Sequence, residues 1–254
     1  GLGDVYKRQE EFRMYKNEEM KILVIIPAYN EEKNIKETVE RLKESAASVD
    51  YVVINDCSKD RTERILKNLG ITYISLPVNL GIGGAVQTGY KYGVENGYDI
   101  AIQMDGDGQH DPKYLDTLIA PIVSGTADVV IGSRFLKKEG FQSSRSRRIG
   151  IRILGMLVSI CCIQQIKDVT SGFRAVNKEF MQVFAKDYPQ DYPEPESIVA
   201  VAMHKGKIAE VPVKMCERHG GESSISFGKS VYYMIKVSLA ILICRISFGV
   251  RRKK

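Results

Sequence analysis

The chain has 254 residues, 44% of them hydrophobic and 27% charged, which is enough to bury a substantial core as one large domain, with or without a C-terminal appendage. Lys and Arg exceed Asp and Glu only by 37 to 31, and no recognition motif accompanies the excess, so we expect no nucleic acid as a partner. The five cysteines include no C-x-x-C pair, which argues against a disulfide framework or a zinc site and favours a reducing cytosol.

The N-terminus carries little structural signal. Residues 1–9 (GLGDVYKRQ) resemble translated adapter sequence, and Met14 or Met20 is the expected natural start. No apolar h-region precedes the first strand, so we do not expect secretion. We assign residues 1–19 to a leader, residues 20–226 to the main domain and residues 227–254 to a C-terminal amphipathic, basic helix.

Short apolar runs alternate with charged, helix-like segments through the first half of the chain. The runs predict strands at 21–26, 51–55, 71–75, 100–104 and 128–131, and the segments between them predict helices at 31–45, 61–68, 84–95 and 112–123. This alternation is typical of an α/β fold, with a mostly parallel sheet covered by helices on both faces. Ligands in such folds bind beyond the carboxyl ends of the strands.

After about residue 135 the alternation stops, and the composition becomes basic and then apolar. Segments 149–166 and 231–250 predict two helices whose uninterrupted apolar stretches are shorter than the roughly 20 residues that cross a bilayer. These helices either pack on the sheet domain or lie in a membrane interface. We favour peripheral membrane contact for the pair, because the chain ends in Arg251-Arg252-Lys253-Lys254 and basic tails are attracted to anionic lipid.

The most informative motif is Asp105-Gly106-Asp107, which follows the predicted strand at 100–104. On an extended backbone, side chains two residues apart point the same way, so both carboxylates can close on one hard cation. Mg²⁺ or Mn²⁺ held in this way completes its coordination with water and substrate phosphate, so the motif predicts a metal-bound diphosphate. A solvated turn is the competing interpretation, because Asp-Gly pairs are common in turns.

A basic segment follows the sheet region. Between residues 134 and 174 only Glu139 and Asp168 oppose nine basic residues, namely Arg134, Lys137, Lys138, Arg145, Arg147, Arg148, Arg152, Lys167 and Arg174. The segment therefore predicts an anionic ligand.

Six motifs occur in the order found in family 2 glycosyltransferases, and the chain most resembles the dolichyl- or polyprenyl-phosphate sugar synthase branch. They are Pro-Ala-Tyr-Asn-Glu-Glu (27–32), Asn-Asp-Cys-Ser-Lys-Asp (55–60), Asn-Leu-Gly-Ile-Gly-Gly-Ala (79–85), Asp-Gly-Asp-Gly-Gln-His-Asp-Pro (105–112), Gly-Ser-Arg (132–134) and Asp-Val-Thr-Ser-Gly-Phe-Arg (168–174). The resemblance covers about residues 21–225 and implies the GT-A form of a Rossmann-like α/β fold, with inversion at the anomeric carbon.

The resemblance assigns nucleotide-sugar binding to the first motif, the end of the second strand, one loop glycine and the first motif aspartate, namely Pro27, Ala28, Tyr29, Glu31, Asn55, Asp56, Gly81 and Asp105. For the glycine-rich motif that begins near Gly81, close packing is at least as good an interpretation as ligand approach. Asn55 departs from the family, which usually has Asp-Asp-Gly-Ser at this point. Its carbonyl can accept from a uracil imide but brings no charge, so UDP-glucose and GDP-mannose both stay open as donors.

The resemblance also assigns the metal and diphosphate to Asp105, Asp107 and Gln109, with His110 as a loop residue. Guanidinium forks suit phosphate, so the expected acceptor-phosphate residues are Arg134, the Arg147-Arg148 pair, Arg174 and Arg218. The expected catalytic residues are Asp107, Asp168 and Arg134. Asp168 would act as a general base only for a hydroxyl acceptor, because a phosphate monoester is already ionised near neutral pH.

The leading hypothesis is therefore a metal-dependent inverting glycosyltransferase that moves a hexose from a nucleotide sugar to polyprenyl phosphate. We expect it to be cytoplasmic and peripheral on the inner face of the cell membrane. One alternative keeps the donor chemistry and uses a saccharide hydroxyl as acceptor in cell-wall or surface polysaccharide synthesis. A remote alternative is a nucleotide-sugar-binding protein without turnover. The sequence indicates neither the oligomeric state nor the preferred metal.

Overall fold

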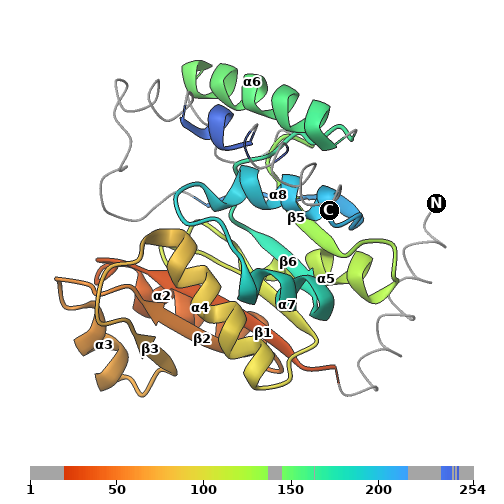
Figure 1. The fold of residues 1–254 in the computed structure, drawn as a ribbon. Coiled ribbons are helices and arrows are strands. Elements are labelled where there is room, and N and C mark those ends of the chain that lie inside the picture. Colours follow the sequence, from red (N-terminus) through yellow and green to blue (C-terminus); the bar gives the residue numbers. More distant parts are fainter. Residues whose placement is uncertain are drawn as a thin grey trace.

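A computed structural model describes residues 20–136, 145–162, 164–216, 236–241, 243 and 245. One seven-stranded sheet, in the order β3-β2-β1-β4-β6-β5-β7, forms its centre (Figure 1). The strands are β1 (Ile22–Ala28), β2 (Asp50–Asn55), β3 (Tyr73–Ser75), β4 (Ile100–Gln103), β5 (Val129–Ser133), β6 (Arg174–Asn177) and β7 (Ile208–Pro212). The helices are α2 (Ile35–Ser45), α3 (Thr62–Asn68), α4 (Gly81–Glu95), η1 (Pro112–Tyr114), α5 (Leu115–Val123), α6 (Arg145–Cys162), α7 (Lys178–Lys186) and α8 (Pro193–Met203).

The central strand β1 is apolar along its whole length because both faces of the sheet are covered. Six consecutive residues of β1, from Leu23 to Ala28, are buried. On one face, helices α2, α3 and α5 contribute Val39, Leu66 and Leu118 to the core. On the other face, α4, α6, α7 and α8 contribute a second set of buried side chains, including Tyr90, Leu154, Phe180 and Ile198. The predicted α/β architecture is therefore confirmed.

Strand β6 runs against its neighbours. It pairs antiparallel with both β4 and β5, whereas β1 pairs parallel with β2 and β4, β2 with β3, and β5 with β7. Because β6 is reversed, its first residue, Arg174, lies at the edge of the sheet where β4 and β5 end. One edge therefore gathers the carboxyl ends of the parallel strands and the start of β6.

The prediction that alternation stops after residue 135 is wrong. Two further strands, β6 and β7, and two further helices, α7 and α8, follow α6. The sequence RAVN of β6 is four residues long and begins with a charged residue, and β7 (IAEVP) is mostly half-buried, so neither gives a continuous apolar run. Each strand takes its place from its neighbours in the sheet, because β-propensity depends strongly on context.

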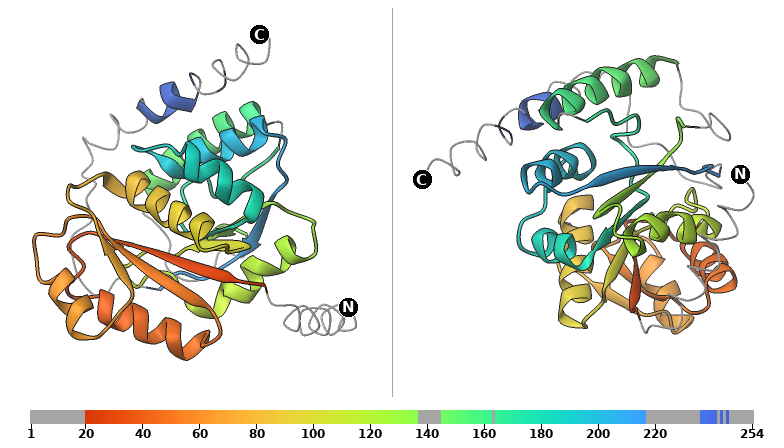
Figure 2. Two further views of the ribbon diagram at one scale, coloured as in Figure 1. Left: turned by 60° about the horizontal axis from the view of Figure 1, so that its bottom comes forward. Right: turned by 90° about the vertical axis from the view of Figure 1, so that its right-hand side faces the viewer.

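The basic helix of the second half is α6, which begins and ends four residues before the predicted 149–166. Residues 236–241 are helical as well, and Val237 and Ile241 share a buried cluster with Leu154 and Val158 of α6. Figures 1 and 2 show this C-terminal segment beside α6. The rest of the predicted 231–250 helix, apart from residues 243 and 245, lies outside the described residues. Within the described residues, no helix is both long enough and apolar enough to cross a membrane.

Helix α4 contacts the sheet through glycines. A Cβ at Gly89 would overlap the side chain of Ile25 on β1, and a Cβ at Gly93 would come within 2.5 Å of Met181 Sδ on α7. The helix therefore approaches both elements more closely than any other residue type would allow. This packing sets the distance between α4 and the strands that carry the candidate site.

We expect Gly89→Ala to destabilise the protein by roughly 1–2 kcal/mol, because the steric cost of overpacking exceeds the gain in helix propensity. Lys91→Ala, on the exposed side of the same helix, is the matched control and should change stability by less than about 0.5 kcal/mol. Urea unfolding monitored by circular dichroism measures both. An equal or higher midpoint for Gly89→Ala would show that α4 can shift without cost.

Candidate active site

The predicted site motifs meet at the edge of the sheet where the parallel strands end. Residues 27–31 span the end of β1 and the loop after it, Asn55 ends β2 and Asp56 follows it, residues 105–111 follow β4 and Arg134 follows β5. The segment 168–173 leads into the reversed strand β6 and so reaches the same edge. Ligand sites of open α/β sheets lie at this edge, so we place the candidate active site here.

The loop that carries Asp105 and Asp107 is fastened through its backbone. Gly106 N–H donates to the Pro27 carbonyl over 3.2 Å, and the Gly106 carbonyl accepts from Thr38 Oγ1 at 3.3 Å. Arg41 Nη1 donates to the Gly108 carbonyl at 3.2 Å. The carboxylates of Asp105 and Asp107 both stay partly exposed on this fastened loop.

Asp105, Asp107 and Gln109 are the residues that could hold a hard divalent cation here. Asp107 Oδ1 accepts from Gln109 N–H at 3.0 Å, which keeps the two residues in one tight turn. No three His, Cys, Asp or Glu side chains form a complete metal cluster in the part of the chain that the structure describes. Two carboxylates and an amide leave coordination positions for water and phosphate oxygens, as Mg²⁺ and Mn²⁺ sites with a nucleotide require.

The segment 168–174 packs directly against Asp105. A Cβ at Gly172 would lie 3.0 Å from Asp105 Oδ2 and 3.0 Å from Gln103 Nε2, so only glycine leaves these groups undisturbed. Gln103 Nε2 in turn donates to Asp105 Oδ1 at 3.2 Å. The backbone of this segment therefore forms one wall beside the first motif aspartate.

Arg134 and Asp168 form a bidentate ion pair at the same edge. Arg134 Nε donates to Asp168 Oδ2 at 2.7 Å, Nη2 donates to Oδ1 at 2.6 Å, and the backbone N–H of Arg134 also donates to Oδ2. Asp168 is fully buried, and the Arg134 side chain is 15% exposed. Burial by itself lowers the pKa of Arg134, but the hydrogen bonds and charge of Asp168 outweigh it and raise that pKa. The guanidinium is therefore permanently charged and fixed in orientation.

The structure does not bring Arg174 to the surface with Arg134. Arg174 is buried, and its guanidinium donates to the carbonyls of Ser171 and Glu194 and to Ser197 Oγ, each at 2.7 Å, and to the Val169 carbonyl at 3.2 Å. These bonds join the 168–174 segment to the N-terminus of α8. The geometry gives Arg174 a structural role here instead of the predicted contact with acceptor phosphate.

Glu194, in the first turn of α8, is not predicted from the sequence and lies near the site, where its backbone carbonyl accepts from Arg174 Nη1 at 2.7 Å. Burial raises the pKa of its carboxyl group, the charge of Asp105 adds to the rise, and Arg174 and Arg134 oppose it. The Glu194 carboxyl therefore belongs to the same electrostatic cluster as the predicted residues. Its sequence signal is a Pro193-Glu194-Pro195 start of a helix, which has no weight unless α8 itself is predicted.

Some of the predicted nucleoside-binding side chains are exposed, and others are buried and hydrogen-bonded within the protein. Tyr29 is 43% exposed and follows Pro27 and Ala28 at the end of β1, where its ring can receive a base. Glu31 is nearly buried, and its Oε2 accepts from Asn34 Nδ2 at 2.7 Å. Of this set, Tyr29 is thus the side chain most open to a ligand.

Asp56 caps a helix in this structure. Its Oδ1 accepts from Leu80 N–H at 2.7 Å and its Oδ2 from Gly81 N–H at 2.9 Å, at the N-terminus of α4. Asn79 Nδ2 also donates to the Asp56 carbonyl. Asp56 is 3% exposed. In the glycine-rich motif 79–85, Gly83 packs against the backbone of Pro189 and Gln190, where a Cβ would overlap, which is a packing role.

Asn55 is likewise engaged inside the protein. Its Nδ2 donates to Ser75 Oγ at 2.9 Å, and Ser75 Oγ donates onward to Glu63 Oε1 at 2.7 Å. Its Oδ1 accepts from Ser58 N–H at 3.3 Å. An amide donor is required at position 55 because the hydroxyl proton of Ser75 is already given to Glu63. The departure from the usual aspartate therefore has a local structural cause.

Three of the predicted acceptor residues have side chains outside the described part of the chain. Arg147 and Arg148 lie in the first turns of α6, but their side chains, like Arg218, lie outside the described residues.

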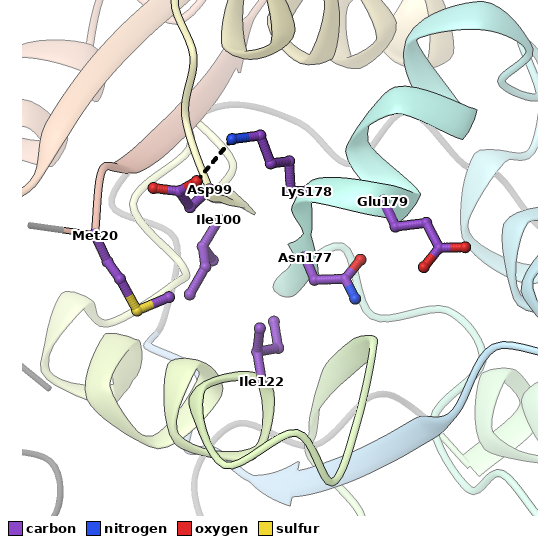
Figure 3. A pocket seen from close by; sticks show the side chains of 7 residues that line it. All are labelled: Met20, Asp99, Ile100, Ile122, Asn177, Lys178 and Glu179. Carbon is purple, nitrogen blue, oxygen red and sulfur yellow. Dashed lines mark hydrogen bonds and ion pairs between the residues drawn. The ribbon is translucent and has the colours of Figure 1, made fainter. Parts of the chain in front are cut away.

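Figure 3 shows a hollow of about 600 Å³ that is separate from the candidate active site. It lies where β4 begins, at the opposite edge of the sheet, and Lys178 Nζ pairs with Asp99 Oδ1 there at 3.0 Å. None of the predicted site residues lines it. We therefore do not assign the active site to this hollow.

We expect Asn55→Asp to destabilise the protein by about 1–2 kcal/mol, because two carboxylates would then face the single hydroxyl proton of Ser75. Adding Glu63→Gln should restore most of the loss, since the new amide can donate to Ser75 Oγ and release its proton to Asp at position 55. Glu63→Gln alone is the control. Denaturant unfolding of the four proteins measures the coupling, and simple additivity would contradict the chain of hydrogen bonds.

Comparison with known proteins finds relatives both in sequence and in fold. The chain is 32% identical to the undecaprenyl-phosphate mannosyltransferase of Micrococcus luteus over 82% of this chain and 89% of that one. It is 30% identical to the UDP-N-acetylglucosamine–dolichyl-phosphate N-acetylglucosaminyltransferase of Methanococcus voltae, over 89% of this chain and 96% of that one. Its fold matches glucosyl-3-phosphoglycerate synthase of Mycobacterium tuberculosis, solved with Mn²⁺, UDP and glucosyl-3-phosphoglycerate, with a TM-score of 0.65 at 19% identity, covering 89% of this chain and 80% of that chain.

The family model described as glycosyl transferase family 2 matches residues 23–184. The match covers most of the sheet domain and includes β1, the Asp105-Gly106-Asp107 loop and β6. The fold, the order of the motifs and this match agree, and the chain belongs to glycosyl transferase family 2.

Proposed function

We propose that this protein transfers a hexose from a nucleotide sugar to polyprenyl phosphate, with inversion, in the presence of Mg²⁺ or Mn²⁺. The observation that carries the proposal is the shared edge: the partly exposed carboxylates of Asp105 and Asp107 lie on the same rim of the sheet as the fixed guanidinium of Arg134. The carboxylates of Asp105 and Asp107 suit a metal-bound diphosphate, and the guanidinium of Arg134 suits an acceptor anion. The names of the Micrococcus and Methanococcus relatives support a lipid-phosphate acceptor.

The donor side of the proposal uses the loops after β1 and β4. A divalent cation held by Asp105, Asp107 and Gln109 would neutralise charge that develops on the departing nucleoside diphosphate. Tyr29 offers its ring to the base, and the tight turn at Asp107 and Gln109 sets the direction of their side chains. The bound Mn²⁺ and UDP of the Mycobacterium fold relative support a divalent metal together with a nucleotide.

The acceptor side uses Arg134 in the role of a fixed cation. Both oxygens of Asp168 accept hydrogen bonds from Arg134, so Asp168 orients the guanidinium and is poorly placed to remove a proton. A phosphate acceptor needs no general base near neutral pH, whereas a saccharide hydroxyl does. This arrangement favours lipid phosphate over a saccharide hydroxyl and leaves the reaction to positioning and electrostatics.

Peripheral membrane contact is part of the proposal. Ile153, Met156 and Ile160 recur along α6 with 56%, 67% and 70% exposure, which forms an apolar stripe on a helix that also carries exposed Arg152. Leu239 and Ile243 are exposed on the adjacent C-terminal segment. An apolar face flanked by basic residues is the composition of helices that lie in an anionic membrane interface. The face would be the cytoplasmic one, where nucleotide sugars are the donors.

The decisive experiment measures transfer of label from a panel of UDP- and GDP-sugars to polyprenyl phosphate in detergent, with Mn²⁺ or Mg²⁺ and then with EDTA. We expect metal-dependent product in the organic phase, and we expect Asp107→Asn to lower the rate at least 100-fold because a ligand charge is lost. Asp116→Asn, an exposed carboxylate of α5, is the control and should keep full activity. Nucleotide release without lipid product would refute the lipid acceptor and favour a saccharide.

The membrane contact has its own test. The triple change Ile153→Gln, Met156→Gln and Ile160→Gln should weaken binding to vesicles that contain anionic phosphatidylglycerol by at least about tenfold, because three apolar side chains lose their burial in lipid. Leu69→Gln and Val94→Gln, which change exposed apolar residues elsewhere, form the matched control. Co-sedimentation measures the bound fraction, and unchanged binding of the triple variant would rule out α6 as the docking face.

A further inference from the structure

We propose that His110 is a positioning residue that holds Asp105 in the orientation that receives the divalent cation. The inference rests on the metal role of Asp105 in the proposed function and assigns its support to a residue that the sequence suggests is only part of a loop. It begins from burial. The His110 side chain is only 4% exposed, and a buried polar ring needs a hydrogen-bond partner.

The partner of His110 is Asp105 itself. The backbone N–H of Asp105 donates to His110 Nδ1 at 2.9 Å, so Nδ1 is the acceptor nitrogen and, in the neutral ring, Nε2 carries the proton. Nε2 lies 3.8 Å from Asp105 Oδ2, close enough to attract the carboxylate and too far to use it as a direct hydrogen-bond acceptor. One imidazole thus fixes the backbone of Asp105 and leaves its carboxylate available to a ligand.

The 168–174 segment orients the His110 ring. The imidazole of His110 stacks on the ring of Phe173, with centroids 4.7 Å apart and planes 8° from parallel. The preceding residue, Gly172, packs against Oδ2 of Asp105, and Gln103 Nε2 donates to Oδ1 of Asp105. Asp105 is therefore held through its backbone by His110, and its Oδ1 accepts from Gln103.

The loop around Asp105 has other fastenings that do not use His110. Thr38 and Arg41 bind the carbonyls of Gly106 and Gly108, and Cys216 N–H donates to the Gln109 carbonyl at 2.9 Å. Loss of the His110 acceptor should therefore leave the loop folded and release Asp105 alone. A hydrogen bond that orients a metal ligand typically contributes 10- to 100-fold to metal affinity.

Two substitutions separate the acceptor from the ring. His110→Phe keeps a ring for stacking on Phe173 and removes the acceptor, whereas His110→Asn keeps an acceptor oxygen near the position of Nδ1 and removes the ring. We expect His110→Phe to weaken Mn²⁺ binding roughly 10- to 100-fold and His110→Asn to stay within about threefold of the unchanged protein. His204→Phe, which changes an exposed histidine in edge contact with Phe180, is the control and should bind Mn²⁺ normally.

Binding is measured by titration with Mn²⁺ alone, followed by the electron paramagnetic resonance signal of the free ion, and folding is checked by thermal unfolding. Equal Mn²⁺ affinity of folded His110→Phe and the unchanged protein would overturn the inference. Equally weak binding by His110→Asn would also overturn it, because the ring and not the acceptor would then matter. If His110→Phe unfolds, His110→Leu, which also removes the acceptor, takes its place beside His110→Asn.

The Mn²⁺ titration does not depend on which sugar acceptor the enzyme uses. If His110→Phe weakens Mn²⁺ binding as expected but the unchanged protein transfers no sugar to polyprenyl phosphate, the proposed reaction is refuted and the inference stands. Lipid product from a folded His110→Phe protein with unchanged Mn²⁺ affinity would do the reverse. Absence of Mn²⁺ binding to the unchanged protein would overturn both the metal role and the inference.

Discussion

The buried guanidinium of Arg174 is the constraint on which the candidate site depends. A guanidinium removed from water is costly unless its donors are satisfied, and this one reaches four oxygen atoms on the 168–174 segment and α8. The segment that it fixes touches both halves of the site. Asp168 orients Arg134, and Gly172 and Phe173 support the Asp105 loop. The proposed donor and acceptor regions thus both pack against the 168–174 segment.

The reversal of β6 explains how that piece of chain reaches the site. In a wholly parallel sheet the residues before a strand lie at the amino edge, far from the ligand. Because β6 is antiparallel to β4 and β5, the residues before it lie beside the carboxyl ends of both neighbours. The reversed strand therefore brings the 168–173 segment and its side chains to the carboxyl edge of the sheet.

Much of the first half of this fold can be read from the sequence because its strands are buried on both faces and appear as apolar runs, as in ILVIIPA of β1. The positions of Asp105, Asp107 and Arg134 at the sheet edge follow from the same pattern. Strands β6 and β7 escape it because they are short and partly polar. The burial of Arg174 and the roles of His110 and Glu194 depend on contacts between distant segments, which periodicity does not record.

The capping of α4 by Asp56 has an energetic consequence for any ligand that reaches this carboxylate. Both oxygens already accept from the amides of Leu80 and Gly81, the first free donors of the helix. A ribose hydroxyl that binds Asp56 must share or displace these amides, and loss of a helix cap costs roughly 1 kcal/mol. Binding of the donor at Asp56 would therefore loosen the first turn of α4, and the glycine contacts of that helix would pass the change to β1 and α7. The sugar of the donor and the backbone amides of α4 thus compete for the same carboxylate.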